Sequence, residues 1–334
     1  MNSFRFLLAI LLFPAVLCVC SFAEAQENPQ QPKQTIQVSV DRVNVGVIVT
    51  DSHGHFVEGL RRENFRMFDN GIEQPLTGFA TIEEPAQVLL LIEAGPAVYL
   101  LESSHVWAAY SLVSGLSAGD RVAVVKYAEA PQAILEFTAD KQAAAAALEQ
   151  LNFNLGFGSL NLSSSVSKVL EWLTSVQGKK TIVLLSTGLD TSASDETASA
   201  LLQLKTSDVR LLAVSLTGVL RNPKPVNKKK SPAKNSTQIA QQFEESDQIL
   251  KRMAESTGGR AYFPTNKNEF NSVYAEIARL VRHEYSLAFA PPVLDGTAHS
   301  IEVRVSLSQD SALNAPVPPY RVDHRQAYLA PAPR

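Results

Sequence analysis

Residues 88–98, VLLLIEAGPAV, place an unbroken apolar run in front of a single carboxylate, Glu93, and a turn of small residues. A short apolar run of this kind is typical of a strand that is buried on both faces of a parallel sheet. In open α/β sheets, ligands meet the loops at the carboxyl ends of the strands. Glu93 stands at such an end, but the turn after it lacks the further polar side chains that a ligand or metal site needs.

Further apolar runs follow this strand, and helical segments separate them. The runs that predict buried strands are 121–128, 181–187, 209–216 and 260–263, and the segments that predict helices are 103–116, 140–151, 162–176, 247–257 and 268–284. In the last helix, apolar residues recur at helical spacing on one face, from Phe270 to Val281. This alternation predicts an α/β fold with a doubly wound, mostly parallel sheet.

The two ends of the chain carry a different pattern. Residues 36–49 alternate between apolar and polar with period two, and the phase slips at Asp41 and Arg42, so two half-buried strands with a bend are expected. The sequence DNG at 69–71 predicts a tight hairpin between two short strands. Strand patterns return near the C-terminus, after residue 284. The N- and C-terminal strands are therefore expected to form a small β-module.

The first 25 residues have the pattern of a secretion signal. Arg5 precedes an apolar stretch that Pro14 interrupts, and Ala23 to Ala25 form a small-x-small cleavage site. A lipoprotein, with Cys20 as the modified residue, is the alternative. Cys18 and Cys20 are the only cysteines, so cleavage near Ala25 leaves a chain without thiols or disulfides. The protein is expected to be exported and to be periplasmic or extracellular.

Charge and hydropathy exclude some classes of partner. The formal net charge is −3, which gives no reason to expect binding to nucleic acid or to an anionic membrane. No segment after the signal is long and apolar enough to be a transmembrane span. Residues 221–234 are basic and rich in proline, and they lie in a loop insertion at 221–243. A solvated loop is the preferred interpretation, and a contact site for an anionic surface is the alternative.

Several blocks of the sequence carry a family resemblance. They are GLRRENFRMFDNGIEQPLTGFA, LSAGDRVAVVKYA, GKKTIVLLSTGLDT, LKRMAESTGGRAYF and EIARLVRHEYSLAFAPP. Their order and spacing resemble the bacterial VWFA-related exported proteins, which carry a von Willebrand factor A (vWA) domain. The resemblance covers nearly the whole mature chain. The expected organisation is a signal peptide at 1–25, a flexible leader at 26–34, the N-terminal β-module at 35–85, the vWA-like domain at 86–284, C-terminal strands at 285–328 that pack with the N-terminal module, and a tail at 329–334.

The resemblance implies a candidate metal site. Many vWA domains hold Mg²⁺ or Mn²⁺ in a metal-ion-dependent adhesion site, with an Asp-x-Ser-x-Ser sequence after the first strand, a Thr from a later loop and an Asp after the fourth strand. In this sequence, Glu93 stands at the first Asp, while Gly95 and Ala97 stand at the two Ser positions. Leu160 stands at the Thr position, where a one-residue slip would offer Ser159. Thr187 stands at the second Asp.

We therefore expect a degenerate site with no metal and no other cofactor. Mg²⁺ wants near-octahedral oxygen ligands, and most of them are missing here. Asp190, three residues beyond Thr187, is expected to point at solvent or to cap the next helix. For Glu93 three surroundings are open: exposure to solvent, hydrogen bonds from backbone N–H groups of the next loop, or pairing with a Lys or Arg.

Other groups of residues give only weak signals for a metal site or a catalytic site. Asp51, His53 and His55 in DSHGHF have spacing compatible with a metal, but a polar turn around Gly54 is the preferred interpretation. His283 and Glu284 are expected to end the last helix. Gly-x-Ser-x-Gly occurs once, in GLSAG at 115–119, but there it follows a predicted helix and precedes a strand, so it lacks the strand-to-helix turn of a nucleophile elbow. The sequence contains no phosphate-binding glycine fingerprint. The sequence gives little support for nucleophilic catalysis, and the expectation is that the protein is not an enzyme.

The leading hypothesis is a non-enzymatic protein-binding or assembly module that acts outside the cytoplasm through the carboxyl-end rim of the sheet. The candidate partner-binding residues are Glu93, Gly95, Pro96, Val98, Tyr99, Phe157, Ser159, Thr187 and Asp190. One alternative is a hydrolase that uses Glu93 as a general base. The other is a purely structural envelope scaffold that the basic loop would anchor.

Overall fold

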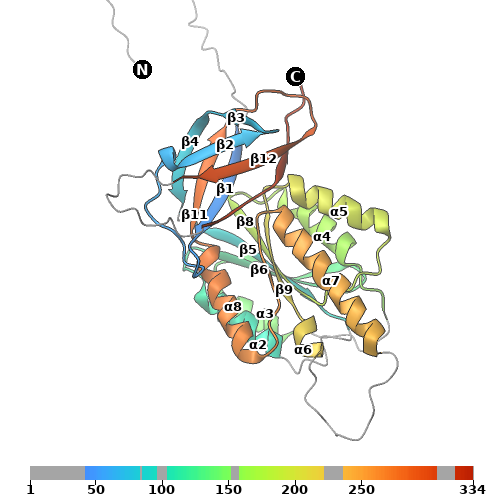
Figure 1. The fold of residues 1–334 in the computed structure, drawn as a ribbon. Helices are drawn as coiled ribbons and strands as arrows, with labels where there is room; N and C mark the ends of the chain where they lie inside the picture. Colours follow the sequence, from blue (N-terminus) through green and yellow to red (C-terminus); the bar gives the residue numbers. More distant parts are fainter. Residues whose placement is uncertain are drawn as a thin grey trace, which may run out of the picture. The chain divides into compact units, whose positions relative to one another are not determined.

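The apolar run that begins at residue 86 forms the central strand of a parallel sheet (Figure 1). The computed structural model describes residues 42–82, 85–95, 104–151, 158–221, 236–306 and 320–333, all of which fall in the compact unit Val40–Arg334. The strands run in the order β10-β9-β8-β5-β6-β7. Their bounds are β5 (Ala86–Glu93), β6 (Arg121–Tyr127), β7 (Pro131–Thr138), β8 (Lys179–Ser186), β9 (Arg210–Ser215) and β10 (Ala261–Tyr262).

Helices cover both faces of this sheet, as the doubly wound prediction requires. Alternate residues of β5 enter two separate cores because successive side chains of a strand point to opposite faces. One face packs against α2 (Ser104–Gly115), α3 (Lys141–Glu149) and α8 (Lys267–Leu280). The other packs against α4 (Leu162–Leu173), α5 (Ser194–Thr206) and α7 (Ser236–Ser256). A short helix, α6 (Thr217–Arg221), follows β9.

The sequence patterns missed three elements of this layer, β7, α5 and the short helix α6, and extended α8 too far. β7 is antiparallel to β6 at the sheet edge, and its mixed burial gives neither an apolar run nor a clean alternation. α5 has only two buried residues, Ala200 and Leu204, so its helical periodicity is weak. α8 ends at Leu280, so the prediction that His283 and Glu284 end this helix is wrong. Glu284 instead opens the next strand, where it pairs with buried basic residues.

The remaining strands form a sandwich of two four-stranded antiparallel sheets, which confirms a β-module built from both ends of the chain. The first sheet has the order β13-β1-β11-β4, and the second has the order β14-β12-β2-β3. The bounds are β1 (Val43–Thr50), β2 (Phe65–Asp69), β3 (Ile72–Gln74), β4 (Leu76–Ile82), β11 (Glu284–Phe289), β12 (Ala298–Val305), β13 (Arg321–His324) and β14 (Ala327–Leu329), with a 3-10 turn at Arg62–Asn64. The inward-facing residues of both sheets share one core.

Two local predictions in this module are confirmed. Asn70 and Gly71 have φ of 48° and 79°, so the DNG stretch forms the hairpin turn between β2 and β3 that needs two left-handed residues. Val43, Val45, Val47 and Val49 are all buried on β1. The predicted phase slip involves Asp41, which lies outside the described residues.

A glycine pair after α7 lets the sandwich approach the parallel sheet closely. Gly258 has φ of 69°, and a Cβ there would lie 2.2 Å from the carbonyl carbon of His324. Next to it, Arg260 donates to Asp323 of β13 and to Thr50 of β1, and its side chain is 8% exposed. The sandwich is thus fixed against the amino-end side of β9 by buried polar contacts.

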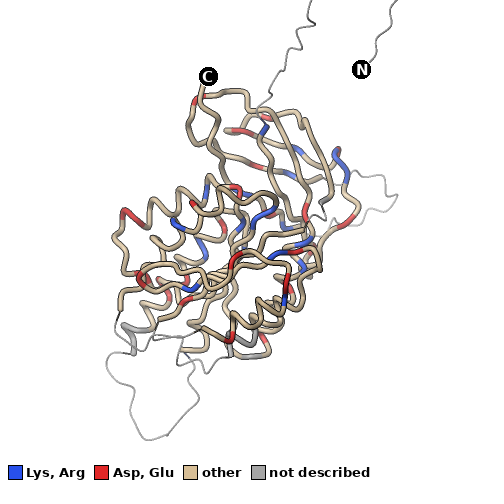
Figure 2. The backbone as a smooth tube through the Cα atoms, turned by 180° about the vertical axis from the view of Figure 1, so that it is seen from behind, with Lys and Arg blue, Asp and Glu red and all other residues tan. Residues whose placement is uncertain are grey.

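Charge is mixed along the described part of the chain. In Figure 2, the Lys and Arg segments and the Asp and Glu segments are interspersed over both the sandwich and the helical layers. The basic stretch at 221–234 lies outside the described residues, apart from Arg221. Among the described helices, none combines the length and apolar character needed to cross a membrane.

Candidate functional site

Three neighbouring strands end together at the carboxyl edge of the parallel sheet. β5 ends at Glu93, which lies opposite Tyr127, the last residue of β6. β8 lies on the other side of β5 and ends at Ser186, followed by Thr187. We call Glu93, Tyr127, Ser186 and Thr187 the carboxyl-edge cluster; each of these residues has 0% exposure.

The carboxylate of Glu93 accepts hydrogen bonds from every other member of the cluster. The backbone N–H of Thr187 donates to Oε2 at 2.7 Å, and its hydroxyl lies 2.8 Å from Oε2 and 3.0 Å from Oε1. The hydroxyl of Ser186 donates to Oε2 at 3.0 Å, and that of Tyr127 reaches it at 3.3 Å. Ser186 Oγ in turn accepts from the N–H of Gly188 at 2.8 Å. The hydrogen bonds of the carboxyl-edge cluster are thus made within the protein.

Burial controls the protonation of this carboxyl group. Removal from water raises the pKa of Glu93, and the hydrogen bonds from Thr187, Ser186 and Tyr127 offset part of that rise. Burial also raises the pKa of the Tyr127 hydroxyl, and the negative charge of Glu93 adds to that rise. Of the three surroundings expected for Glu93, exposure to solvent is wrong. The expected backbone N–H bond exists, but the donor belongs to the loop after β8, not to the loop after β5.

An apolar side chain fills the place beside the first turn. Leu160 is 8% exposed, and a Cβ added at Gly95 would lie 2.7 Å from its Cδ2 atom. A serine at position 95 would therefore collide with Leu160 unless the leucine moved. The two replacements are linked. Leu160, at the position of the threonine ligand in the family pattern, has room because Gly95 stands at the position of a serine ligand.

Asp190 caps a helix, but this helix is not the one expected from the sequence. Its carboxylate accepts from the backbone N–H groups of Leu162 and Ser163, at 3.1 and 3.0 Å, and from that of Ser192 at 3.0 Å. It therefore caps the N-terminus of α4, whose own Asn161 makes no side-chain capping bond. The expected positions at solvent or on the next helix, α5, are both wrong.

The loops that carry Leu160 and Asp190 are also bonded directly to each other. The N–H of Thr191 donates to the carbonyl of Leu160 at 2.7 Å, and the N–H of Leu160 donates to Thr191 Oγ1 at 3.0 Å. The side chain of Asn161 then donates to the carbonyl of Glu129, in the turn after β6. Internal hydrogen bonds thus hold the described loops of this edge together.

These residues do not fit the metal that the family resemblance implies. Mg²⁺ needs several oxygen ligands at about 2.1 Å in near-octahedral geometry. At this edge the oxygens of Glu93 are engaged by four donors, and Gly95 and Leu160 offer no side-chain oxygen. Within the described residues, no group of three or more His, Cys, Asp and Glu side chains is arranged to hold a metal ion.

The candidate rim residues occupy different positions in the structure. Glu93, Gly95 and Thr187 are buried, Asp190 is half-buried, and Ser159 is exposed. Pro96, Val98, Tyr99 and Phe157 lie outside the described residues. Tyr127 and Ser186 were not predicted from the sequence. Aligning the last residues of the adjacent parallel strands would have found both, since Ser186 directly follows an apolar run and Tyr127 follows one after Lys126.

The histidine-containing stretch near the N-terminal module forms a turn. Asp51 Oδ1 accepts from the backbone N–H groups of His53 and His55, each at 2.8 Å. The hydrogen bond from His55 is the main reason why the pKa of Asp51 is lowered. The preferred interpretation of DSHGHF as a polar turn agrees with these bonds.

Comparison with known proteins gives the family. Residues 107–276, about half of the 334-residue chain, match the von Willebrand factor type A domain. No curated protein sequence matches the chain.

Solved structures similar to the chain include an aerotolerance-related membrane protein from Bacteroides fragilis, with 14% identity, a TM-score of 0.44, and coverage of 59% of this chain and 98% of that one. A von Willebrand factor type A protein from Catenulispora acidiphila has 10% identity and a TM-score of 0.45, with coverage of 80% and 74%. The vWF domain of the pilus tip protein Mfa5 from Porphyromonas gingivalis has 10% identity and a TM-score of 0.44, with coverage of 60% and 96%. On the match over residues 107–276, the chain belongs to the von Willebrand factor type A domain family.

Proposed function

We propose that this chain is a protein-binding or assembly module that acts outside the cytoplasm and contacts its partner through the carboxyl-edge loops without a metal ion. The observation that carries the proposal is the burial of Glu93, whose carboxylate is engaged by Thr187, Ser186 and Tyr127. A metal-dependent adhesion site needs such a carboxylate to face an open coordination sphere. In this chain, the Glu93 carboxylate accepts hydrogen bonds that stabilise the carboxyl edge of the sheet.

The described loops of this edge leave a small polar surface for a partner. Ser159 and Thr191 are exposed, and they flank the buried Leu160. Because these loops are bonded to each other, a partner would meet a surface that is already ordered and would spend little free energy on ordering it. Recognition would then depend on shape and on direct contacts, including apolar contacts from the residues between 96 and 100.

Export remains part of the proposal and rests on the sequence alone. Residues 1–25 have the pattern of a cleaved signal peptide and lie outside the described residues. A mature chain that begins near residue 26 has no cysteine and therefore needs no oxidising compartment to fold.

The hydrolase alternative requires Glu93 to touch a substrate or an attacking water molecule. A general base must lie within hydrogen-bonding reach of the proton that it removes. With 0% exposure and its oxygens occupied by protein donors, Glu93 is placed for a structural task. The scaffold alternative depends on the basic loop at 221–234, and deleting this loop and fractionating cells would test it.

The proposal is tested by capturing partners on the immobilised mature chain from an envelope extract, with and without EDTA. The same partner should be retained in both conditions. Ser159→Arg places a long charged side chain on the rim and should reduce retention at least tenfold, while Ser175→Arg, beyond the far end of α4, should not. Loss of the partner in EDTA with recovery in Mg²⁺ would contradict metal independence. Equal retention by both variants would show that the partner binds elsewhere.

A further inference from the structure

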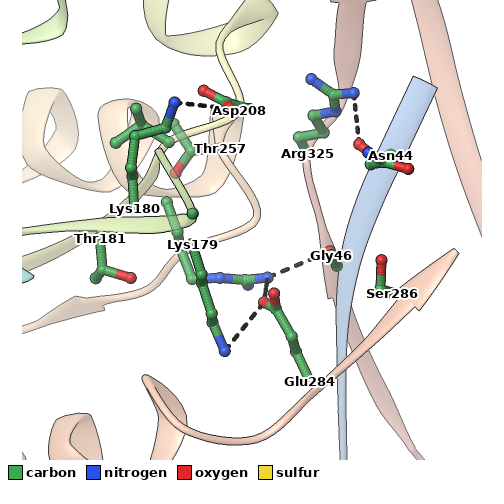
Figure 3. Close-up of a pocket in the computed structure, with 13 residues that line it drawn as sticks. Asn44, Gly46, Lys179, Lys180, Thr181, Asp208, Thr257, Glu284, Ser286 and Arg325 are labelled. Atoms are coloured by element: carbon green, nitrogen blue, oxygen red, sulfur yellow. Dashed lines mark hydrogen bonds and ion pairs between the residues drawn. The ribbon is translucent and has the colours of Figure 1, made fainter. Parts of the chain in front are cut away.

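A cavity of about 320 Å³ lies at the opposite edge of the parallel sheet, where β8 and β9 begin (Figure 3). Lys179 and Arg210 are the first residues of these strands, and Glu284 and Asn44 come from β11 and β1 of the sandwich. We call this the amino-edge pocket. It is independent of the proposed partner surface because it lies at the other ends of the same strands.

The lining of the amino-edge pocket is positively charged. Lys179, Lys180, Arg210 and Arg325 contribute four basic groups, against two acidic groups from Asp208 and Glu284, so the formal charge is +2. Lys180 Nζ pairs with Asp208 at 2.8 Å, and the side chain of Asp208 is 61% exposed. Setting that pair aside leaves three basic residues and one carboxylate.

Glu284 is shared between two of these cations. Its Oε2 lies 3.4 Å from Lys179 Nζ and 3.3 Å from Arg210 Nη2. The side chains of Lys179, Arg210 and Glu284 are 7%, 8% and 10% exposed. Gly46 of β1 makes room for this carboxylate, since a Cβ there would lie 2.8 Å from Oε2. One carboxylate cannot neutralise two buried cations, so a positive charge remains in the pocket.

Two buried polar atoms of the lining, Thr181 Oγ1 and Arg325 Nε, lack a hydrogen-bond partner within the protein. Lys179 Nζ makes no well-aligned hydrogen bond and has only its ion pair with Glu284 at 3.4 Å. The guanidinium of Arg325 is otherwise fixed, because its Nη atoms donate to the carbonyls of Ser207 and Asn44. A buried donor without an acceptor costs about 1–3 kcal/mol, so these groups favour a ligand that accepts hydrogen bonds.

The pKa of Lys179 is consistent with a site for an anion. Burial lowers the pKa of its ammonium group, and the charge of Glu284 only partly offsets that effect, while the charge of Arg210 adds to it. An anion in the pocket would stabilise the charged form. The four-carbon stem of lysine is flexible, so its ammonium group can turn toward such a ligand.

We propose that the amino-edge pocket binds a small dianion, a phosphate group or a dicarboxylate. Two negative charges balance the formal charge of the lining, and oxygen acceptors suit ammonium, guanidinium and hydroxyl donors. The cavity volume lies at the small end of the range for small-molecule sites. Because the walls come from both the parallel sheet and the sandwich, a bound dianion would also hold the two together.

Isothermal titration calorimetry on the full mature chain at low ionic strength tests this site. Inorganic phosphate and succinate are titrated separately, with sodium chloride of matched ionic strength as the blank. We expect saturable binding of at least one of them with a Kd of about 1 mM or tighter. Binding of phosphate alone assigns a phosphate ligand, and binding of succinate alone assigns a dicarboxylate. Binding of neither overturns the proposal.

Two variants locate the bound anion. Lys179→Met keeps the apolar stem and removes the charge, and it should weaken binding at least about tenfold. Thr181→Val keeps the shape and removes the unpartnered hydroxyl, and it should weaken binding by about threefold or more while leaving the midpoint of urea unfolding unchanged or higher. Lys168→Met, on the exposed face of α4, is the matched control and should bind like the wild type. Wild-type affinity in both Lys179→Met and Thr181→Val would overturn the assignment.

Discussion

Both edges of the parallel sheet bury polar groups, but the two edges differ in whether these groups have hydrogen-bond partners within the protein. At the carboxyl edge, Glu93 is surrounded by donors from Tyr127, Ser186 and Thr187, and each of these bonds is made within the protein. At the amino edge, the buried hydroxyl of Thr181 has no hydrogen-bond partner, and Lys179 Nζ has only its ion pair with Glu284. Among the described residues, the polar groups of the carboxyl edge are paired within the protein, whereas some of those at the amino edge are not.

The difference shows why the identity of a residue is not enough to assign a site. A carboxylate at a strand end can serve a ligand or the fold, and the hydrogen bonds around it decide which. Glu93 serves the fold. At the amino edge, Lys179 and Arg210 carry more positive charge than Glu284 can neutralise. A ligand can therefore bind to these two cations.

Removing the shared carboxylate of the amino edge should have the largest effect. Glu284→Ala leaves Lys179 and Arg210 buried without a counter-charge and should cost about 3–5 kcal/mol in the free energy of unfolding. Urea denaturation of the mature chain measures this. Glu302→Ala, which removes an exposed carboxylate paired with Arg304, should leave the urea midpoint nearly unchanged. Equal losses in the two variants would show that Glu284 does not neutralise buried charge.

Truncating the central carboxylate of the carboxyl edge should have the next largest effect. Glu93→Ala leaves the N–H of Thr187 and the hydroxyls of Ser186 and Thr187 without their acceptor, so we expect a loss of about 3 kcal/mol. Glu93→Gln keeps one oxygen and should lose about 1 kcal/mol. Both are read from urea unfolding curves. A loss in Glu93→Ala no larger than in Glu93→Gln would contradict the closed cluster.

A pair of isosteric threonine substitutions compares the two edges directly. Thr187→Val removes a hydroxyl that bonds to Glu93 and should cost about 1–3 kcal/mol. Thr181→Val removes a hydroxyl without a partner and should be neutral or stabilising in unliganded protein. Thermal and urea unfolding of both variants give the comparison. A similar cost at both positions would remove the distinction between a satisfied and an unsatisfied edge.

The pH dependence of stability should show the smallest effect. Because burial raises the pKa of Glu93 in the folded protein above its unfolded value, the folded state binds more protons between these two values. The stabilising contribution of Glu93 is therefore fully present below about pH 4.5, its unfolded pKa, and is lost as pH rises through the folded pKa.

Urea unfolding of the wild type and Glu93→Gln from pH 4 to pH 8 tests that sign. The advantage of the wild type over Glu93→Gln should shrink as the pH rises. Glu302→Gln serves as a control of opposite sign, because hydrogen bonding to Arg304 lowers the pKa of Glu302. An advantage that grows with pH at position 93 would mean that the folded protein prefers the charged carboxylate.

The sequence predicted most of the fold because its strongest signals are local. The apolar runs that became β5, β6, β8 and β9 fixed the sheet, and the DNG turn fixed a hairpin. β7 and α5 were not predicted because they are only partly buried. Their apolar periodicity is weak, and packing defines them instead. Glu284 was placed on a helix since the apolar pattern of α8 continues through Val281 into the turn.

The candidate site was less predictable because it depends on contacts between distant residues. Matching family positions singled out Glu93 and Thr187, but their bond to each other is a property of two adjacent strand ends. The packing of Leu160 against Gly95 and the capping of α4 by Asp190 likewise join separate loops. The amino-edge pocket gave no sequence signal, since its residues come from β1, β8, β9, β11 and the segment around Arg325.

The most direct test of the difference between the two edges is an amide NMR titration of the isotopically labelled mature chain with Mg²⁺ and, separately, with phosphate. The account predicts saturable phosphate shifts around Lys179, Thr181 and Arg210, and no saturable Mg²⁺ shifts at Ala94, Thr187 and Gly188. Saturable Mg²⁺ shifts at those carboxyl-edge amides, absent in Glu93→Gln, together with unchanged amides around the amino-edge pocket in phosphate, would contradict it.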